Sequence, residues 1–314
     1  MFDIFSLSLN NRPESTRTSS IQQEYLLNLL ILVYAFPFLP HSGSPPCTGF
    51  SRANRAANGD GGKKDEKDRK LTNLYFEILL DLMPDTITME NVDNILSPKY
   101  EKYLKDGISK LIEAGYQCVL LNVSSASFGD PQERKRCILI CVKNTLPFDP
   151  DLLKVTHGNT DGLLGFVTPK NVLGDLEDAK PGGVLRSATD SHLIYDHVKK
   201  GTELPDDENE IVKLEPDKPA KTLTKSNHLQ HYKHKDRGLT IRELARLQSF
   251  PDSYWFSGDV KCQRDQIGNA VPCKLAEAVG LFVLRSYLWP YETKADAEMF
   301  GKSLEEAWGS TGEQ

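Results

Sequence analysis

The clearest helical pattern in the chain lies between residues 71 and 83. Apolar side chains recur there at intervals of three and four residues, which is the spacing of one face of a helix. A helix over 71–83 would end at Pro84, because a proline cannot continue the backbone hydrogen bonds. Residues 98–114 predict a second helix that stops at Gly115, a residue suited to the position after a helix end.

Three short apolar runs predict strands, at residues 86–89, 118–123 and 137–142. Their alternation with helices predicts an α/β fold in which helices cover a twisted sheet. Glu90 directly follows the first of these runs. It should therefore lie at the carboxyl end of a strand, where open α/β sheets bind their ligands.

Regular periodicity is lost between residues 143 and 235, which predicts a second, loop-rich lobe. Charges are segregated in and after it. Residues 201–215 carry six acidic side chains and one basic one, whereas residues 216–246 carry eight basic and three acidic ones. The basic half is suited either to contact with phosphate or to an ordinary solvated surface.

Two more helices are predicted near the end of the chain. A capping box at Thr240 and Glu243 predicts a helix that runs to Leu247. A final helix should extend from residue 274 to about 288, with Pro272 near its first turn. Its side chains are mostly apolar, which predicts burial.

A stiff turn places a lone cysteine between two prolines and a glycine. Pro45 and Pro46 exclude a helix and a central strand, and Gly49 allows a tight bend just after Cys47. Such a turn presents the thiol at the edge of an element, although a buried structural cysteine is the other interpretation. The polar, glycine-rich residues 52–70 that follow predict a mobile segment.

Composition limits the function classes. With 314 residues, of which 39% are hydrophobic, the chain can form one large globular domain or two smaller ones. A net charge of −6 argues against a uniform coat of nucleic acid and is compatible with a local basic cleft. Six scattered cysteines without a C-x-x-C pair predict neither a metal site nor a disulfide framework. The most apolar run, residues 25–40, is shorter than the roughly 20 residues of a membrane span and contains two prolines, so we expect no membrane anchor.

Five blocks of the sequence resemble, in order, those of the DNA (cytosine-5)-methyltransferases. They are PPCTGFSRANR, MENV, FGDPQERKR, LTIRELARLQSFPD and QIGNAVP. The resemblance covers residues 43–287 and implies an α/β fold, with a Rossmann-like sheet that uses S-adenosyl-L-methionine and a smaller loop-rich target-recognition lobe. It also implies transfer of a methyl group to C5 of cytosine in double-stranded DNA, which would bind between the two lobes.

The implied organisation divides the chain into five parts. They are an atypical N-terminal segment, the first part of the catalytic domain, the recognition lobe, the returning part of the catalytic domain and a C-terminal tail. Their expected bounds are residues 1–42, 43–142, 143–235, 236–290 and 291–314, respectively.

The resemblance implies a covalent mechanism on a base that is flipped out of the duplex. Cys47 matches the nucleophile that adds to C6 of cytosine, and Glu90 matches the acid that acts at N3. Arg136 matches the arginine that donates to O2, and Arg134 matches a supporting arginine near the nucleophile. The two guanidinium groups are expected to favour the Cys47 thiolate over the thiol.

Further positions match cofactor and DNA contacts of the family. Pro46, Asn269 and Ala270 match residues beside S-adenosyl-L-methionine, and no metal is implied. The mobile segment 52–70 matches a loop that closes over the target base. Ser51 and Arg55 are candidate phosphate contacts there, and a merely solvated loop is the alternative.

The sequence departs from the family's pattern at its start. No Phe-x-Gly-x-Gly strand and turn precedes Gly43, so we expect the chain to lack the N-terminal, cofactor-binding strands of the sheet. Three interpretations stay open. The chain is an incomplete gene product, which we favour, or one half of a split enzyme whose missing strands come from a second chain, or a DNA-binding relative without catalysis. Thr48 also stands where the family usually has glutamine.

The expected cofactor affinity, substrate and location follow from the same resemblance. Alone, the chain is expected to bind S-adenosyl-L-methionine weakly or not at all. A transfer RNA substrate is an alternative to DNA, since one branch of the family modifies RNA, although PPCTGFS looks more like the DNA-acting branches. We expect a nuclear location if the source is a eukaryote and a cytoplasmic one otherwise.

Overall fold

The computed structural model describes seven stretches of the chain, residues 40–50, 63–146, 148–150, 153–176, 211–224, 228–233 and 238–288. Within them the main sheet has four strands in the order β1-β2-β5-β3. Their bounds are β1 Pro40–Gly43, β2 Thr86–Val92, β3 Tyr116–Ser124 and β5 Lys135–Lys143. Strand β1 pairs with β2 in parallel, whereas β5 is antiparallel to both of its neighbours, so the sheet is mixed.

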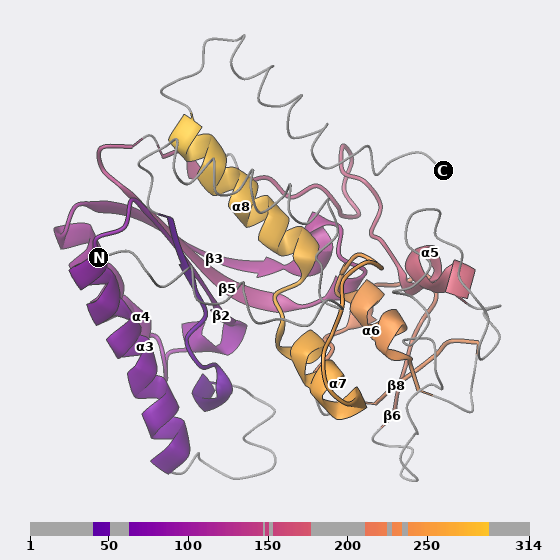
Figure 1. The fold of residues 1–314 in the computed structure, drawn as a ribbon. Coiled ribbons are helices and arrows are strands. Elements are labelled where there is room, and N and C mark those ends of the chain that lie inside the picture. The colour runs from indigo at the N-terminus through magenta and orange to yellow at the C-terminus, as the bar shows by residue number, and fades with distance from the viewer. Residues whose placement is uncertain are drawn as a thin grey trace, which may run out of the picture.

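The side chains of β5 are buried in two hydrophobic cores, one on each face of this sheet. Its odd-numbered side chains from 137 to 141 are buried with those of α3 (Lys63–Leu82) and α4 (Lys102–Glu113). Its even-numbered side chains from 138 to 142 are buried with those of α8 (Cys273–Leu288). Figure 1 shows α3 and α4 on one side of the sheet and α8 on the other. Successive residues of a strand face opposite sides, so a continuous apolar run fits a strand that is covered on both faces.

Helix α3 begins at Lys63, not at residue 71 as expected. The prediction of a mobile segment over 52–70 is therefore wrong for residues 63–70, and its remainder lies outside the described residues. The charges of this stretch support the helix, because Lys70 and Glu66, four residues apart, form an exposed ion pair of 3.1 Å. The charged side chains of this part of α3 thus lie on a solvated helix face and not in a loop.

Strand β2 extends beyond the apolar run 86–89, because its pairing with β5 continues to Val92. The strand pairs with β5 along its whole length, from Thr86 opposite Val142 to Val92 opposite Arg136. Glu90 therefore lies near the carboxyl end of β2, as expected, with two further residues of the strand after it. Polar residues can extend the strand in this way because the ladder bonds are made by the backbone.

The ends of the predicted helices are largely confirmed. Gly115 follows α4 with a φ of +95°, the left-handed conformation expected after a helix end. Thr240 caps α6 (Ile241–Leu247) with the predicted capping box, in which Glu243 N donates to Thr240 Oγ1 over 3.2 Å and Thr240 N donates to Glu243 Oε2 over 2.7 Å.

Two α-helices of the described ranges were missed. One is the short α5 (Pro169–Leu173). The other, α7 (Val260–Asn269), begins after Asp259, whose carboxylate accepts a hydrogen bond from Cys262 N over 2.7 Å.

A second set of elements packs around its own core, which includes Leu239, Leu247 and Phe256. The elements of this set are α5 Pro169–Leu173, β6 Ile211–Lys213, β7 Ala220–Lys221, β8 His228–Gln230, α6 Ile241–Leu247 and α7 Val260–Asn269. The strands are short and most of the chain between them is irregular, in agreement with a loop-rich lobe. The exact boundaries expected for the five parts of the chain stay predictions.

No helix of the described ranges is by itself long and apolar enough to cross a membrane, although α7 and α8, with a bend of 41° between them, reach that length and composition as a pair. The same ranges hold no group of three or more His, Cys, Asp or Glu side chains that could bind a metal ion.

Candidate active site

The Pro-Cys turn follows β1 directly and is stabilised from outside by side chains. Phe50 N donates to Cys47 O over 3.0 Å, which closes a single turn of 3-10 helix over Thr48–Phe50. Neither proline has an N–H, so the turn has few backbone bonds of its own. Asn91, which is buried in β2, donates through Nδ2 to Pro45 O over 3.1 Å. A residue of the MENV block thus fixes the turn that carries the thiol.

The far side of the turn is fixed by aromatic packing and two further side chains. Phe50 is fully buried, and its ring meets that of Tyr100 edge to face at 5.4 Å. Arg69 of α3 donates through Nη1 to Gly49 O over 3.0 Å, and its guanidinium lies 5.7 Å from the Tyr100 ring. Asn94 Nδ2 donates to Phe50 O. The turn is therefore held at both ends, which limits how far the Cys47 side chain can move.

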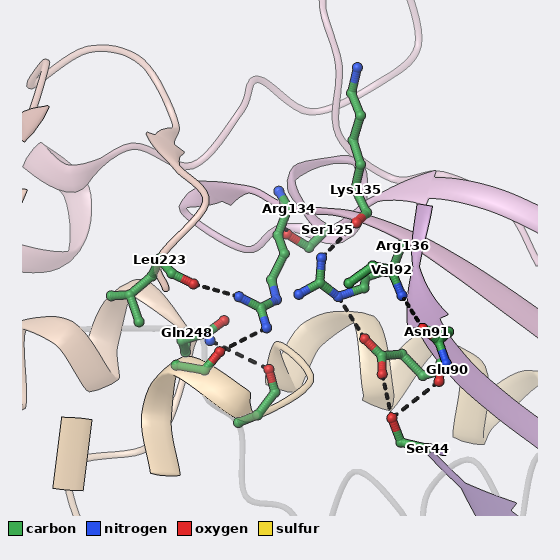
Figure 2. A network of polar contacts seen from close by, with 12 residues as sticks. Ser44, Glu90, Asn91, Val92, Ser125, Arg134, Lys135, Arg136, Leu223 and Gln248 are labelled. Atoms are coloured by element: carbon green, nitrogen blue, oxygen red, sulfur yellow. Dashed lines mark hydrogen bonds and ion pairs between the residues drawn. The ribbon is translucent and has the colours of Figure 1, made fainter. Parts of the chain in front are cut away.

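Glu90 and Arg136 form the centre of the polar network in Figure 2. Arg136 Nε lies 2.6 Å from Glu90 Oε1, and the two side chains are 9% and 16% exposed. On the other side of the carboxylate, Ser44 Oγ lies 2.6 Å from Glu90 Oε2. Arg136 Nη1 also donates to Lys135 O over 2.7 Å. Both oxygens of the carboxylate are thus engaged, which fixes its orientation.

The strand register explains why these residues meet. Glu90 lies opposite Ile138, and Val92 lies opposite Arg136. Glu90 and Arg136 are therefore diagonal neighbours on one face of the sheet, within reach of long side chains. On the other side, Gly43 of β1 pairs with Met89, so the next residue of each strand, Ser44 and Glu90, also come together.

Arg134 is close to Arg136 in sequence but has different partners. Its guanidinium donates to Leu223 O over 2.6 Å and to Gly268 O over 2.9 Å. Nε is buried without a hydrogen-bond partner among the described residues. Burial, together with the neighbouring Arg136 charge, lowers the pKa of the Arg134 guanidinium to about 9. Arg134 thus ties three chain segments together, and its supporting role beside the nucleophile stays a prediction.

Two glutamines complete this junction. Gln132 Oε1 accepts from Leu223 N over 2.8 Å, and Gln132 Nε2 donates to Leu247 O over 3.2 Å. Gln248 Nε2 donates to Ile267 O over 2.7 Å. Both side chains are fully buried. The QERKR block thus joins the sheet to the lobe and to the end of α7.

The Cys47 thiol is half-buried, and burial raises its pKa above the ordinary value. The Glu90 carboxylate raises the pKa further, while Arg136 and Arg134 lower it by less. As expected, the two guanidinium groups act in favour of the thiolate, but they do not set the net shift. Desolvation and the adjacent carboxylate outweigh them.

Sequence comparison agrees with this geometry. Residues 41–283 match the family model of the C-5 cytosine-specific DNA methylases.

The chain belongs to this family. The type II methyltransferase M.BspRI of Lysinibacillus sphaericus is 28% identical over 260 residues, which cover 76% of this chain and 58% of that protein. The type II methyltransferase M1.HphI of Haemophilus parahaemolyticus is 28% identical over 253 residues, covering 77% and 67% of the two proteins. The chain therefore spans only 58% of the length of the first relative.

Solved structures confirm the expected fold class. A prophage-encoded protein of Escherichia coli, described as a DNA modification methyltransferase, superposes with a TM-score of 0.58 at 19% identity over 88% of this chain and 85% of that one. The methyltransferase EhMeth of Entamoeba histolytica gives a TM-score of 0.51 at 16% identity over 88% and 82%. At these identities the likeness concerns the fold, a Rossmann-like methyltransferase sheet, and nothing more.

Three residues that match cofactor contacts of the family lie around the same junction. Pro46 and Asn269 are exposed, and Ala270, the residue after α7, is half-buried. Arg134 interacts with the sequence neighbours of these residues. Its guanidinium donates to Gly268 O, and its charge acts to lower the pKa of Cys47. The contact of Pro46, Asn269 and Ala270 with S-adenosyl-L-methionine stays a prediction. Ser51 and Arg55, the candidate phosphate contacts, lie outside the described residues.

The sequence analysis missed several residues of the site. Ser44 precedes the PPCTGFS block, and Arg69 belongs to the stretch that was expected to be mobile. Asp130 lies within the FGDPQERKR block, and its sequence neighbours assign it no role. Its buried carboxylate accepts from Lys274 N and Leu275 N at the start of α8, over 3.3 and 3.1 Å. Only the capping preference of aspartate could have indicated this role, because the helix that it caps lies far away in the chain.

Proposed function

We propose that this protein transfers a methyl group to C5 of cytosine in double-stranded DNA, through a covalent bond between Cys47 Sγ and C6 of a flipped base. One observation carries the proposal. A thiol on a fixed turn, a carboxylate of β2 and a guanidinium of β5 come from three separate segments and interact electrostatically. A purely DNA-binding surface needs no such thiol, whereas addition to a pyrimidine ring needs all three groups.

In this mechanism the Glu90 carboxylate takes up the proton that the Cys47 thiol loses, and the Cys47 sulfur bonds to C6 of the base. The electron pair displaced from the C5–C6 double bond is stabilised as Glu90 gives its proton to N3 and Arg136 donates to O2. S-adenosyl-L-methionine supplies the methyl group. A base then removes the proton from C5, the carbon–sulfur bond breaks, and the thiolate of Cys47 leaves as the ring double bond re-forms. The N3 proton returns to Glu90.

The raised pKa of Cys47 is consistent with this role. The ionised Glu90 carboxylate opposes a thiolate at Cys47, whereas a protonated Glu90 would not. Movement of one proton onto Glu90 therefore removes the unfavourable charge and leaves the two guanidinium groups to stabilise the thiolate. The acid and the nucleophile are thus activated together, only when the base is in place.

The test is covalent trapping on a duplex in which the target cytosine is 5-fluorocytosine, with S-adenosyl-L-methionine present. Fluorine at C5 cannot leave as a proton, so the adduct should persist on a denaturing gel. We expect an adduct with the wild-type chain, none with Cys47→Ser, and an unchanged yield with Cys262→Ser, because Cys262 is exposed on α7 and outside the site.

Other results would replace the proposal. A DNA shift on native gels without any adduct would identify a DNA-binding relative without catalysis. An adduct that forms only when a second chain is added would identify one part of a split enzyme. Methylation of transfer RNA in place of DNA would change the substrate and keep the mechanism.

A further inference from the structure

The hydroxyl group of Ser44 lies directly against the Glu90 carboxylate. Ser44 Oγ is 2.6 Å from Glu90 Oε2 and 3.1 Å from the Glu90 backbone oxygen. Ser44 is the first residue after β1 and comes directly before the block that carries Cys47, so one short segment contacts the acid and supplies the nucleophile. Figure 2 shows Ser44 and Arg136 on opposite sides of the carboxylate.

The two oxygens of Glu90 have chemically different partners. Oε1 lies 2.6 Å from Arg136 Nε, and a guanidinium nitrogen can only donate. A proton on Oε1 would therefore lie beside a positive guanidinium group that cannot accept it. Oε2 faces a hydroxyl group, which has one donor and two acceptor lone pairs. The exchangeable proton of the carboxyl group thus belongs on Oε2.

We propose that Ser44 is a positioning residue that holds Glu90 so that Oε2 carries the proton exchanged with N3 of the target cytosine. The inference rests on the function proposed above. While Glu90 is ionised, the hydroxyl donates to Oε2. When Oε2 carries the proton, Ser44 binds its remaining lone pair and leaves the O–H to point toward the base. The proton leaves Oε2 for N3 and returns to Oε2 at the end, so none is consumed.

Several titratable and charged groups act on this carboxyl. They include the Cys47 thiol on the turn, Arg136 and Cys137 on β5, and Arg134 just before β5. Removal of the Ser44 hydroxyl takes one donor from the carboxyl group that exchanges the proton. The pH–rate profile of the reaction should therefore change.

The test compares three variants in methyl transfer to duplex DNA. Ser44→Ala should lower kcat about tenfold, the size expected for one hydrogen bond to a charged group, and leave KM for DNA unchanged. Ser44→Thr keeps the hydroxyl and should restore most of the rate and the pH profile. Ser42→Ala is the matched control, because Ser42 is an exposed serine two residues before Ser44, in β1, and it pairs with Thr88 and not with Glu90. It should behave as the wild type.

Three results would overturn the inference. They are an unchanged kcat and pH profile in Ser44→Ala, a loss that Ser44→Thr does not restore, and a change in KM alone. Ser44 is exposed, so Ser44→Ala should leave the folded state intact, which thermal unfolding verifies.

A second measurement is independent of activity. In 13C-labelled protein, the Glu90 carboxyl resonance, assigned with Glu90→Gln, should move in Ser44→Ala and stay in place in Ser42→Ala. A wild-type chain that forms no adduct and transfers no methyl group would refute the proposed function, while this resonance would still decide whether Ser44 positions Glu90. An unchanged resonance in Ser44→Ala would refute the positioning role.

Discussion

The regions around Arg136 and Arg134 differ in the groups that contact the guanidinium, although the two residues lie only two positions apart in the sequence. Arg136 pairs with a carboxylate at the carboxyl end of β2, next to an exposed serine and a half-buried thiol. Arg134 is buried and binds only neutral carbonyl groups, those of Leu223 and Gly268. One guanidinium faces groups that can react, and the other faces backbone that cannot.

This difference indicates separate roles for two arginines of the same block. A guanidinium that is paired with a side chain at the site can bind a substrate, because a substrate group can replace one of its hydrogen-bond partners. A charge that is buried among carbonyls is costly to disturb, since each carbonyl would lose its partner. We therefore expect changes at Arg136 to affect mainly chemistry and changes at Arg134 to affect mainly folding.

The largest expected effect is on catalysis at Arg136. Arg136→Leu should lower the rate of adduct formation with 5-fluorocytosine DNA by two to three orders of magnitude, about 3–4 kcal/mol, because a donor to the developing charge is lost. Its free energy of unfolding should also fall, by roughly 1–3 kcal/mol, since the ion pair is largely buried and Glu90 loses its cationic partner. A variant that unfolds while keeping normal chemistry would reverse the assignment.

The next effect is on stability at Arg134. Arg134→Met should lower the free energy of unfolding in urea by about 3 kcal/mol, because two buried carbonyl groups lose their donor. Lys135→Met is the matched control, since Lys135 is the exposed residue between the two arginines, and its change should stay within about 0.5 kcal/mol. Equal losses in the two variants would show that Arg134 does not join the segments.

Asp130 gives the junction a pH dependence. Burial raises the pKa of its carboxyl from 3.8 to about 6, so between these values the folded protein binds the proton more readily than the unfolded chain does. The free energy of unfolding should therefore fall as pH rises from about 4 to about 6, by roughly 3 kcal/mol. In Asp130→Asn this fall should disappear, as urea unfolding of both proteins across this pH range would reveal. Parallel curves for the two proteins would contradict the assignment.

The smallest expected effect is on the reactivity of Cys47. Glu90→Gln removes a charge that raises the pKa of the thiol, so alkylation of Cys47 by iodoacetamide at pH 8 should become several times faster. Burial continues to raise the pKa, which limits the gain. Mass spectrometry of the Cys47 peptide separates this reaction from alkylation of the exposed Cys262. A slower reaction in the variant would mean that the carboxylate does not oppose the thiolate.

The sequence determined the local features of the fold. Periodicity located α4, α6, α8 and the cores of three strands, because one face of each element must be apolar. The order of five blocks indicated the family, and the residue types within them were enough to identify Cys47, Glu90, Arg134 and Arg136 as candidate site residues. Charge patterns were less informative. The same alternating charges that suggested a mobile segment form the exposed face of α3.

Only the tertiary structure decided which contacts the site residues make and how burial and charge together act on the Cys47 thiol. The contact of Ser44 with Glu90 depends on the register between β1 and β2, and the joining role of Arg134 depends on carbonyl groups 89 and 134 residues away along the chain. The raised pKa of Cys47 depends on how much burial and negative charge surround the sulfur, whereas the sequence indicated only the two arginines, which act in the opposite direction. A sequence specifies which groups are available, but their net effect depends on distances and desolvation, which exist only once the segments have packed together.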